Sequence, residues 1–160
     1  LRAGVLGAND GIVSVAAIVV GVAGASSTLS AVVTAGVAGL VAGALSMATG
    51  EYVSVSSQRD AERAGRATPD DELTNPWHAA TASLGAFVIG GIVPLLAVLA
   101  PWATVPTVFA AVVLALVVTG AVSARIGGAP VRRAVLRNVA GGSLAMAVTF
   151  AVGSLVGLAV

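Results

Sequence analysis

Two carboxylates, Asp10 and Glu51, interrupt otherwise apolar stretches of the chain. A carboxylate at membrane depth costs about 2.5–3.5 kcal/mol on insertion scales, so such a residue is expected to have a function. Asp10 lies eight residues after Arg2, and Glu51 lies eight residues before Arg59. With a rise of about 1.5 Å per helical residue, each acid lies roughly 12 Å from its arginine along the helix axis. On antiparallel neighbouring helices the two acids are therefore predicted to share one depth.

Met47 precedes Glu51 by four residues, which puts both side chains on the same face of a helix. A lone methionine in a membrane helix is more often a packing residue, but two nearby acids favour a ligand. A soft thioether combined with hard carboxylates suits a first-row transition metal. We therefore predict that Asp10, Met47 and Glu51 bind metal. Further oxygens near this depth form a candidate secondary polar lining: Asn9, Ser14, Ser46 and Tyr52.

Other reactive residues do not form a catalytic set. Ser14 and Ser83 have no nucleophile-elbow context and no nearby histidine partner, so an intramembrane serine hydrolase is not supported. His78, the only histidine, is either an interfacial residue or a metal or proton relay. We therefore expect no enzyme, no catalytic residue and no permanently bound cofactor.

One chain supplies too few of the predicted ligands to replace the hydration shell of an ion. A two-fold axis beside the helices that carry Asp10 and Glu51 doubles the predicted ligands to four carboxylates and two thioethers. Two-fold dimers are also the commonest closed assembly. Small residues also repeat one turn apart in Gly7-xxx-Gly11, Gly39-xxx-Gly43 and Gly153-xxx-Gly157, which favours close helix packing within the bundle or between subunits. We therefore predict a parallel homodimer, with the first two helices near its axis.

The composition identifies the elements that must hold these residues. The 160 residues are 58% hydrophobic and only 9% charged, with a mean hydropathy of +1.02, whereas soluble domains carry about 25% charged residues. Disordered chains, nucleic-acid binders and cytosolic enzymes are poor fits, and the lack of cysteine excludes disulfides and thiolate metal sites. We predict an all-α integral membrane protein with one domain over residues 1–160. Five segments are long enough to span a bilayer, at about 3–24, 29–53, 77–100, 105–124 and 138–160.

The arginines set the expected orientation. Arg2 precedes the first segment, and the other basic residues lie in the connections 59–76 and 125–137, whereas the turns 25–28 and 101–104 carry no charge. By the positive-inside rule the N-terminus and both longer connections are cytosolic, and five spans then leave the C-terminus on the opposite side. The first connection also contains an acidic run that is either a solvated linker or a cytosolic entrance for cations: Asp70, Asp71 and Glu72.

Three blocks of sequence carry a resemblance: LRAGVLGANDGIVS, LVAGALSMATGEYVSVSSQRD and NPWHAATASLGAFVIGGIVPLL. They resemble the vacuolar iron transporter family, and the similarity runs over essentially the whole chain. The resemblance implies a homodimer of five-helix subunits that moves Fe²⁺, and often Mn²⁺, out of the cytosol in exchange for protons. It also implies that Asp10 of the ANDG block and Met47 of the SMA block line the metal pathway. Glu51 occupies the GEY position of the second block.

The chain departs from many members of this family in one region. Those members insert a glutamate-rich, helical metal-binding domain in the cytosol between the second and third spans. Here only Gln58 to Pro76 lies in that place, which is too short for such a domain. The chain therefore looks closest to the nodulin-21-like branch, which lacks it.

The expected function is antiport of Fe²⁺ or Mn²⁺ against protons, which removes metal from the cytosol. The alternatives are a passive channel for divalent cations and a structural membrane protein without transport. The expected partners are the lipid bilayer, divalent metal ions and a second copy of the chain, but no nucleic acid. Arginine in place of lysine, with abundant alanine, valine and glycine, indicates a GC-rich bacterial genome. The expected location is therefore a bacterial cell membrane, or a vacuolar membrane in a eukaryote.

Overall fold

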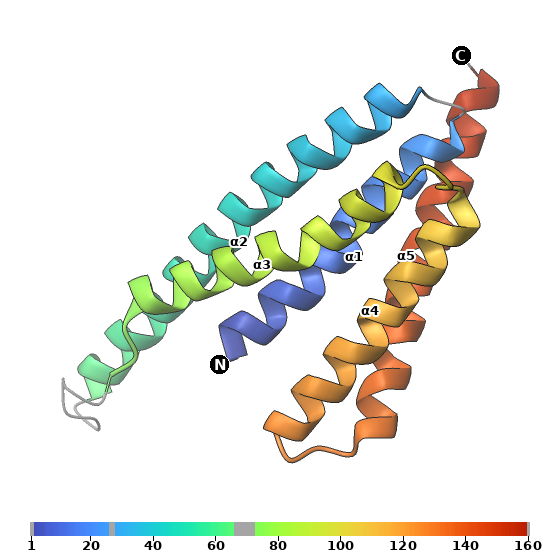
Figure 1. Cartoon of the computed structure of the whole chain (residues 1–160). Coiled ribbons are helices and arrows are strands. Elements are labelled where there is room, and N and C mark those ends of the chain that lie inside the picture. Colours follow the sequence, from blue (N-terminus) through green and yellow to red (C-terminus); the bar gives the residue numbers. More distant parts are fainter. Residues whose placement is uncertain (1, 26–27, 66–72, 160) are drawn as a thin grey trace.

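The computed structural model describes residues 2–25, 28–65 and 73–159, and over these ranges it contains helices and no strand. Each of the helices is long and apolar enough to cross a membrane. Successive helices run antiparallel, so the two termini lie at opposite ends of the bundle (Figure 1). The described part therefore confirms the predicted all-α fold with five membrane-length helices: α1 (Arg2–Gly24), α2 (Leu29–Gly65), α3 (Pro76–Leu99), α4 (Val105–Ile126) and α5 (Val131–Ala159).

Local signals in the sequence fix where α3 and α4 begin. The side chain of Asn75 accepts hydrogen bonds from the backbone N–H groups of Trp77, at 2.9 Å, and His78, at 3.4 Å, and Pro76 opens the helix. Thr104 and Thr107 form a reciprocal capping box at the start of α4. Such caps satisfy backbone donors that a helix start leaves free. They hold the first turn of α3, which includes His78, in a defined position.

Two helices extend well beyond the predicted spans. α2 continues past its membrane span to Gly65, the end that the sequence allows for a helical extension into the cytosol, and α5 begins at Val131 instead of residue 138. Residues 59–65 of the first predicted connection and most of the second, 125–137, are therefore helical. The physical reason is that hydropathy and helix propensity differ. The stretch 58–64, QRDAERA, is too polar for a membrane span, but its alanines, arginines, glutamine and glutamate favour a helix.

α1 is the central helix of the bundle. It packs against all four other helices, and its contact with α3 is the most extensive. Gly7 and Gly11 lie in this contact, where a Cβ atom on Gly7 would come within 2.5 Å of the carbonyl oxygen of Ser83. A Cβ atom on Gly11 would overlap the carbonyl oxygen of Phe87. The backbones of α1 and α3 therefore meet because glycine leaves room for them.

The other small-residue pairs also pack inside the chain. Gly153 lies against the backbone of Gly21, so α5 approaches α1 as closely as α3 does. On α2, a Cβ atom on Gly39 would meet the side chain of Ile18, and one on Gly43 would meet the ring of Phe87. Of the two roles that the sequence left open for these glycines, packing within the bundle is the one observed. The contacts of these glycines within one chain therefore give no separate support for a subunit interface.

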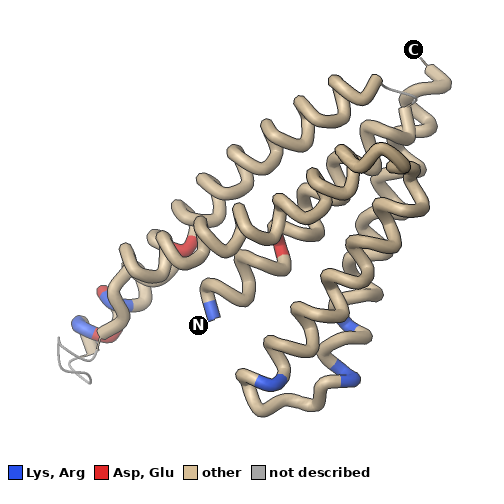
Figure 2. Tube along the Cα trace, in the orientation of Figure 1, with Lys and Arg blue, Asp and Glu red and all other residues tan. Residues whose placement is uncertain are grey.

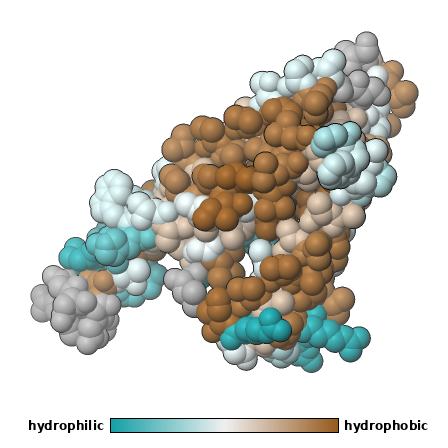
Figure 3. Space-filling model, in the orientation of Figure 1, coloured by the Kyte–Doolittle hydropathy of each residue, from teal (hydrophilic) through white to brown (hydrophobic). Residues whose placement is uncertain are grey.

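The surface of the bundle is apolar along its length and charged at one end. Large hydrophobic side chains are exposed on the outside, for example Ile89 at 71% and Leu144 at 66%, and they form the apolar surface visible in Figure 3. Arginines gather where α1 begins, where α2 ends and where α4 turns into α5 (Figure 2). We call this the basic end, and it includes Arg2, Arg59, Arg125 and Arg133.

Candidate metal site

Asp10 lies on a side of α1 that the other helices leave partly open. Its carboxylate is half-buried and accepts a hydrogen bond from the Oγ of Ser14, one turn further along, at 3.0 Å. This side of α1 also carries, at helical spacing, Leu6 and Ala17. Leu6 is 48% exposed, and Asp10 and Ala17 are half-buried. Gly7 and Gly11, by contrast, are buried against α3. The Asp10 carboxylate is thus held by one local hydrogen bond and retains lone pairs for a ligand.

Met47 and Glu51 lie one turn apart on α2, as their spacing predicts. Met47 is partly buried and packs against the hydrophobic core of the bundle. Glu51 is half-buried and lines a cavity of about 430 Å³ near the basic end. The same cavity is lined by Arg2 of α1, Gln58 of α2 and His78 of α3. Residues of α1, α2 and α3 therefore line the same cavity as the Glu51 side chain.

The described part of one chain places Met47 and Glu51 one turn apart on α2 and Asp10 on α1. No group of three or more histidine, aspartate or glutamate side chains able to hold an ion is found among the described residues. Asp10 does not belong to the lining of the Glu51 cavity. The described residues of one chain therefore form no site from histidine, aspartate and glutamate alone, and a site formed by Asp10, Met47 and Glu51 stays a prediction.

The predicted secondary lining divides among different environments. Ser14 contacts Asp10, as described above. Ser46 is exposed on the outer side of α2. The ring of Tyr52 packs against the ring of Trp77, with centroids 4.7 Å apart, and lines a separate cavity with Arg59. Asn9 points into a cavity between α1, α4 and α5, where its Oδ1 is buried without a hydrogen-bond partner. Asn9 and Asp10 diverge because successive helical residues point about 100° apart.

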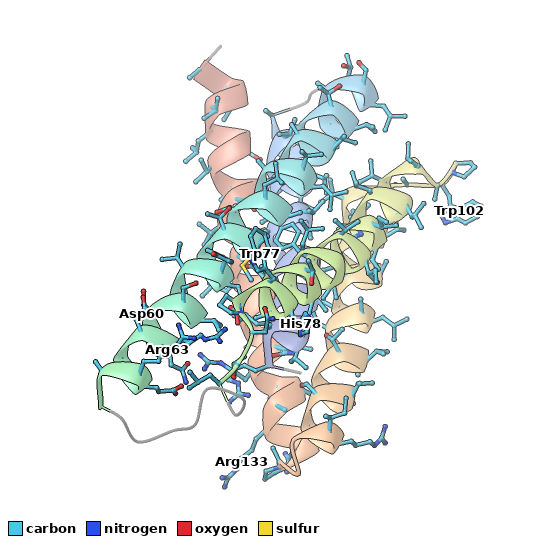
Figure 4. The ribbon with its side chains drawn as sticks, turned by 90° about the vertical axis from the view of Figure 1, so that its left-hand side faces the viewer. Asp60, Arg63, Trp77, His78, Trp102 and Arg133 are labelled. Carbon is cyan, nitrogen blue, oxygen red and sulfur yellow. The ribbon has the colours of Figure 1, made fainter. Side chains whose placement is uncertain are left out.

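Two further predicted features concern the basic end. Asp70, Asp71 and Glu72, the candidate cation entrance, lie outside the described residues. His78 is exposed at the start of α3, beside the extended end of α2 that carries Asp60 and Arg63 (Figure 4). The sequence did not predict that His78 shares a cavity with Glu51. The sequence feature that could have pointed to this contact was the Asn75 cap, which fixes the first turn of α3. The approach of that turn to α2, however, depends on tertiary packing.

The fold and these side chains define the class of the protein: a helical membrane protein with carboxylates within its membrane-length helices. The model of the VIT family matches residues 1–75 and 65–154 of the chain. "Vacuolar iron transporter homolog 1" of Oryza sativa subsp. japonica is 48% identical over 99% of this chain and 74% of its own length. "Vacuolar iron transporter homolog 4" of Arabidopsis thaliana is 46% identical over 98% of this chain and 84% of its own length. The chain belongs to the VIT family.

Proposed function

We propose that the chain transports a divalent transition metal, Fe²⁺ or Mn²⁺, out of the cytosol in exchange for protons. Membership of the VIT family and the names of the relatives support iron transport. The observation that carries the proposal to this chain is the pair of half-buried carboxylates, Asp10 and Glu51, within helices of membrane length. Buried acids at such positions are typical of ion and proton pathways.

Proton coupling follows from the chemistry of a carboxylate in an apolar environment. Desolvation favours the neutral carboxylic acid, whereas an arriving dication favours the ionised carboxylate. Metal binding therefore releases protons, and protonation from the far side helps to displace the metal. In this mechanism Asp10 and Glu51 bind metal and carry protons in alternation. Met47 adds a soft sulfur ligand, which favours transition metals over Mg²⁺.

A homodimer supplies the missing ligands in this proposal. Asp10 lies on the partly open side of α1, and α2 and α5 do not contact each other in the described part of the chain. The outer side of α2 is exposed along most of the bundle, with Val41 at 55% and Leu45 at 58%. A second copy packed against α1 and α2 would bring the Asp10 and Met47 pairs toward one axis. The exposed outer side of α2 and the shortage of ligands in one chain are the observations that support the dimer.

The orientation in the proposal has the basic end in the cytosol, by the positive-inside rule. The names of the relatives support a vacuolar membrane, and these plant proteins lend no support to a bacterial cell membrane. The chain has no native cysteine, so single cysteines can report the two ends. We expect Ala129→Cys, in the turn between α4 and α5, to react from the cytosolic side. Thr104→Cys, before α4, is expected to react only from the opposite side, and labelling of both from one face would contradict the orientation.

The test is metal uptake into proteoliposomes with and without a pH gradient. We expect Asp10→Asn and Glu51→Gln each to reduce Fe²⁺ and Mn²⁺ flux strongly, because the amides keep the size of the side chain but lose its charge and exchangeable proton. The matched control is Asp60→Asn, an exposed acid on the extended end of α2, which should transport at the native rate. All three variants should elute as folded protein of native size.

The same assay separates the alternatives. A passive channel predicts a metal flux that does not respond to the pH gradient. A structural membrane protein predicts no flux at all and amide variants that differ in nothing measurable. Native flux in Asp10→Asn would show that the pathway does not use α1, which contradicts the proposal.

A further inference from the structure

Two adjoining cavities lie next to the Glu51 cavity and are lined by residues of α1, α3, α4 and α5. The Glu51 cavity shares Ala82 with the inner one and Arg2 with the outer one. The inner cavity has a volume of about 390 Å³ and a mostly apolar lining that includes Val5, Ala86 and Val118. The outer cavity has a volume of about 450 Å³ and opens at the basic end, where Arg2 and Arg137 line it. Both cavities share the side chains of four residues: Val5, Asn9, Ser123 and Asn138. The two cavities therefore adjoin at these side chains, with an apolar inner part and a charged mouth.

The charge of this mouth favours an anion and opposes a metal ion. Neither lining contains an aspartate or a glutamate. The adjacent turn between α4 and α5 carries Arg125, Arg132 and Arg133, and the sequence after Glu72 has no acidic residue. Figure 3 shows these hydrophilic side chains below the apolar surface of α4 and α5. Arg2 also lines the Glu51 cavity, whereas Arg137 lines only this mouth. The two arginines together favour a negatively charged group at the mouth.

Polar groups at the junction of the two cavities need a further partner. The Oδ1 of Asn9 is buried and has no hydrogen-bond partner, and a buried acceptor without a donor costs about 1–3 kcal/mol. The hydroxyl of Ser123 donates to the backbone oxygen of Gly120 at 3.1 Å, so its lone pairs remain available. A ligand that fits here therefore donates hydrogen bonds at the junction and presents a negative charge at the mouth.

We propose that this space binds an anionic phospholipid whose headgroup carries hydroxyl groups, such as phosphatidylglycerol or phosphatidylinositol. The phosphate lies between Arg2 and Arg137, a headgroup hydroxyl donates to Asn9, and part of one acyl chain lies along the apolar inner cavity. Basic pockets between helices at the cytosolic side of a membrane are a known means of binding such headgroups. The combined size lies within the range of ordinary ligand sites, about 300–1,000 Å³.

The test is lipid retention by the full chain in detergent, measured by native mass spectrometry after delipidation and addition of phosphatidylglycerol or phosphatidylcholine. We expect one phosphatidylglycerol to be retained per chain, and retention of phosphatidylcholine to be at least tenfold lower. The double variant Arg2→Gln/Arg137→Gln should lower phosphatidylglycerol retention to the phosphatidylcholine level. Arg132→Gln/Arg133→Gln loses the same charge outside the cavity and should retain the lipid. An equal loss of phosphatidylglycerol retention in both double variants would mean that the overall positive charge attracts the lipid. That result would overturn the proposed site.

A second pair of variants tests the apolar inner part. Gly4 lines it, and a Cβ atom at Gly4 would meet no atom within 4 Å, so leucine has room there and should take up part of the cavity. Gly4→Leu should weaken phosphatidylglycerol retention several-fold, whereas Gly141→Leu, at an equally open position on α5, should not. If millimolar inorganic phosphate displaces the bound lipid and Gly4→Leu has no effect, the site takes free phosphate and the lipid proposal is wrong. Equal retention of both lipids would also overturn it.

Discussion

α1 and α2 are neighbouring apolar helices that are covered to very different extents. In the apolar 18-residue stretch of α1, 39% of the residues are buried within the chain. In the corresponding stretch of α2, 17% are buried. α1 packs against every other helix, whereas α2 packs against α1 and α3 in the part of the chain that the structure describes. Hydropathy does not distinguish the central helix α1 from the outer helix α2, since the two stretches have the same mean hydropathy of 1.9.

The glycines of the two helices reflect this difference. Gly7 and Gly11 of α1 lie against backbone atoms of α3, which have no freedom to move aside. Gly39 and Gly43 of α2 lie against side chains, those of Ile18 and Phe87. The same small-residue spacing thus marks a backbone crossing in one helix and a pocket for a side chain in the other. Substitutions at these glycines should therefore have unequal effects.

The largest effect on folding is expected for Gly11→Ala. The added methyl group would overlap the carbonyl oxygen of Phe87, so α1 and α3 must separate. Overpacking of this kind costs about 3 kcal/mol, or more where backbone must move. The measurement is thermal unfolding in detergent, followed by fluorescence and size-exclusion chromatography. A native melting temperature for Gly11→Ala would contradict the close approach of α1 and α3.

The uncovered side of α2 is tested by a bulky residue. If this side faces a second copy, Ala42→Trp should lower the cross-linked dimer fraction about tenfold and reduce transport. Ala147→Trp, at an exposed position on α5, is the control and should stay dimeric. Dimers of native yield in both variants would mean that the outer side of α2 faces lipid.

A smaller effect is expected for Met47→Leu. The substitution nearly preserves volume and apolarity, so its cost to folding should stay below about 1.5 kcal/mol. The apparent affinity for Fe²⁺ should fall by about tenfold, a scale typical of changes near a metal, while any residual response to Mg²⁺ stays the same. The readout is uptake with each cation offered separately across a pH gradient. Unchanged Fe²⁺ affinity would assign Met47 to packing alone.

The smallest effect is expected for Gly39→Ala, the counterpart of Gly11→Ala on α2. The new methyl group meets the terminal methyl of Ile18, which can change rotamer. Alanine also favours a helix over glycine by about 0.8–1.0 kcal/mol, which offsets part of the contact. The melting temperature should therefore change little. A loss as large as that of Gly11→Ala would mean that α2 is held as rigidly as α1.

Much of the fold was predictable because membrane helices require long apolar runs. The start of α5 was less predictable, since the apolar segment begins near residue 138 while the helix already begins at Val131. Asp10 and Glu51 were identified as unusual by their cost in an apolar segment, which needs no knowledge of packing. The approach of His78 to the Glu51 cavity depends on how α3 packs against α2. Helix geometry alone separates Asn9 from Asp10, but the cavity that Asn9 lines depends on how α3, α4 and α5 pack against α1.

The length of α2 has a mechanical consequence. A continuous helix of 37 residues is about 55 Å long, whereas the hydrocarbon core of a bilayer is about 30 Å thick. In the proposed orientation the polar end of this helix, near Gly65, projects beyond the hydrocarbon core as a rigid spacer. Extra chain added at such an exposed end adds little strain to the bundle. This end is therefore a natural position for grafting a fluorescent reporter or a rigid fusion partner for imaging.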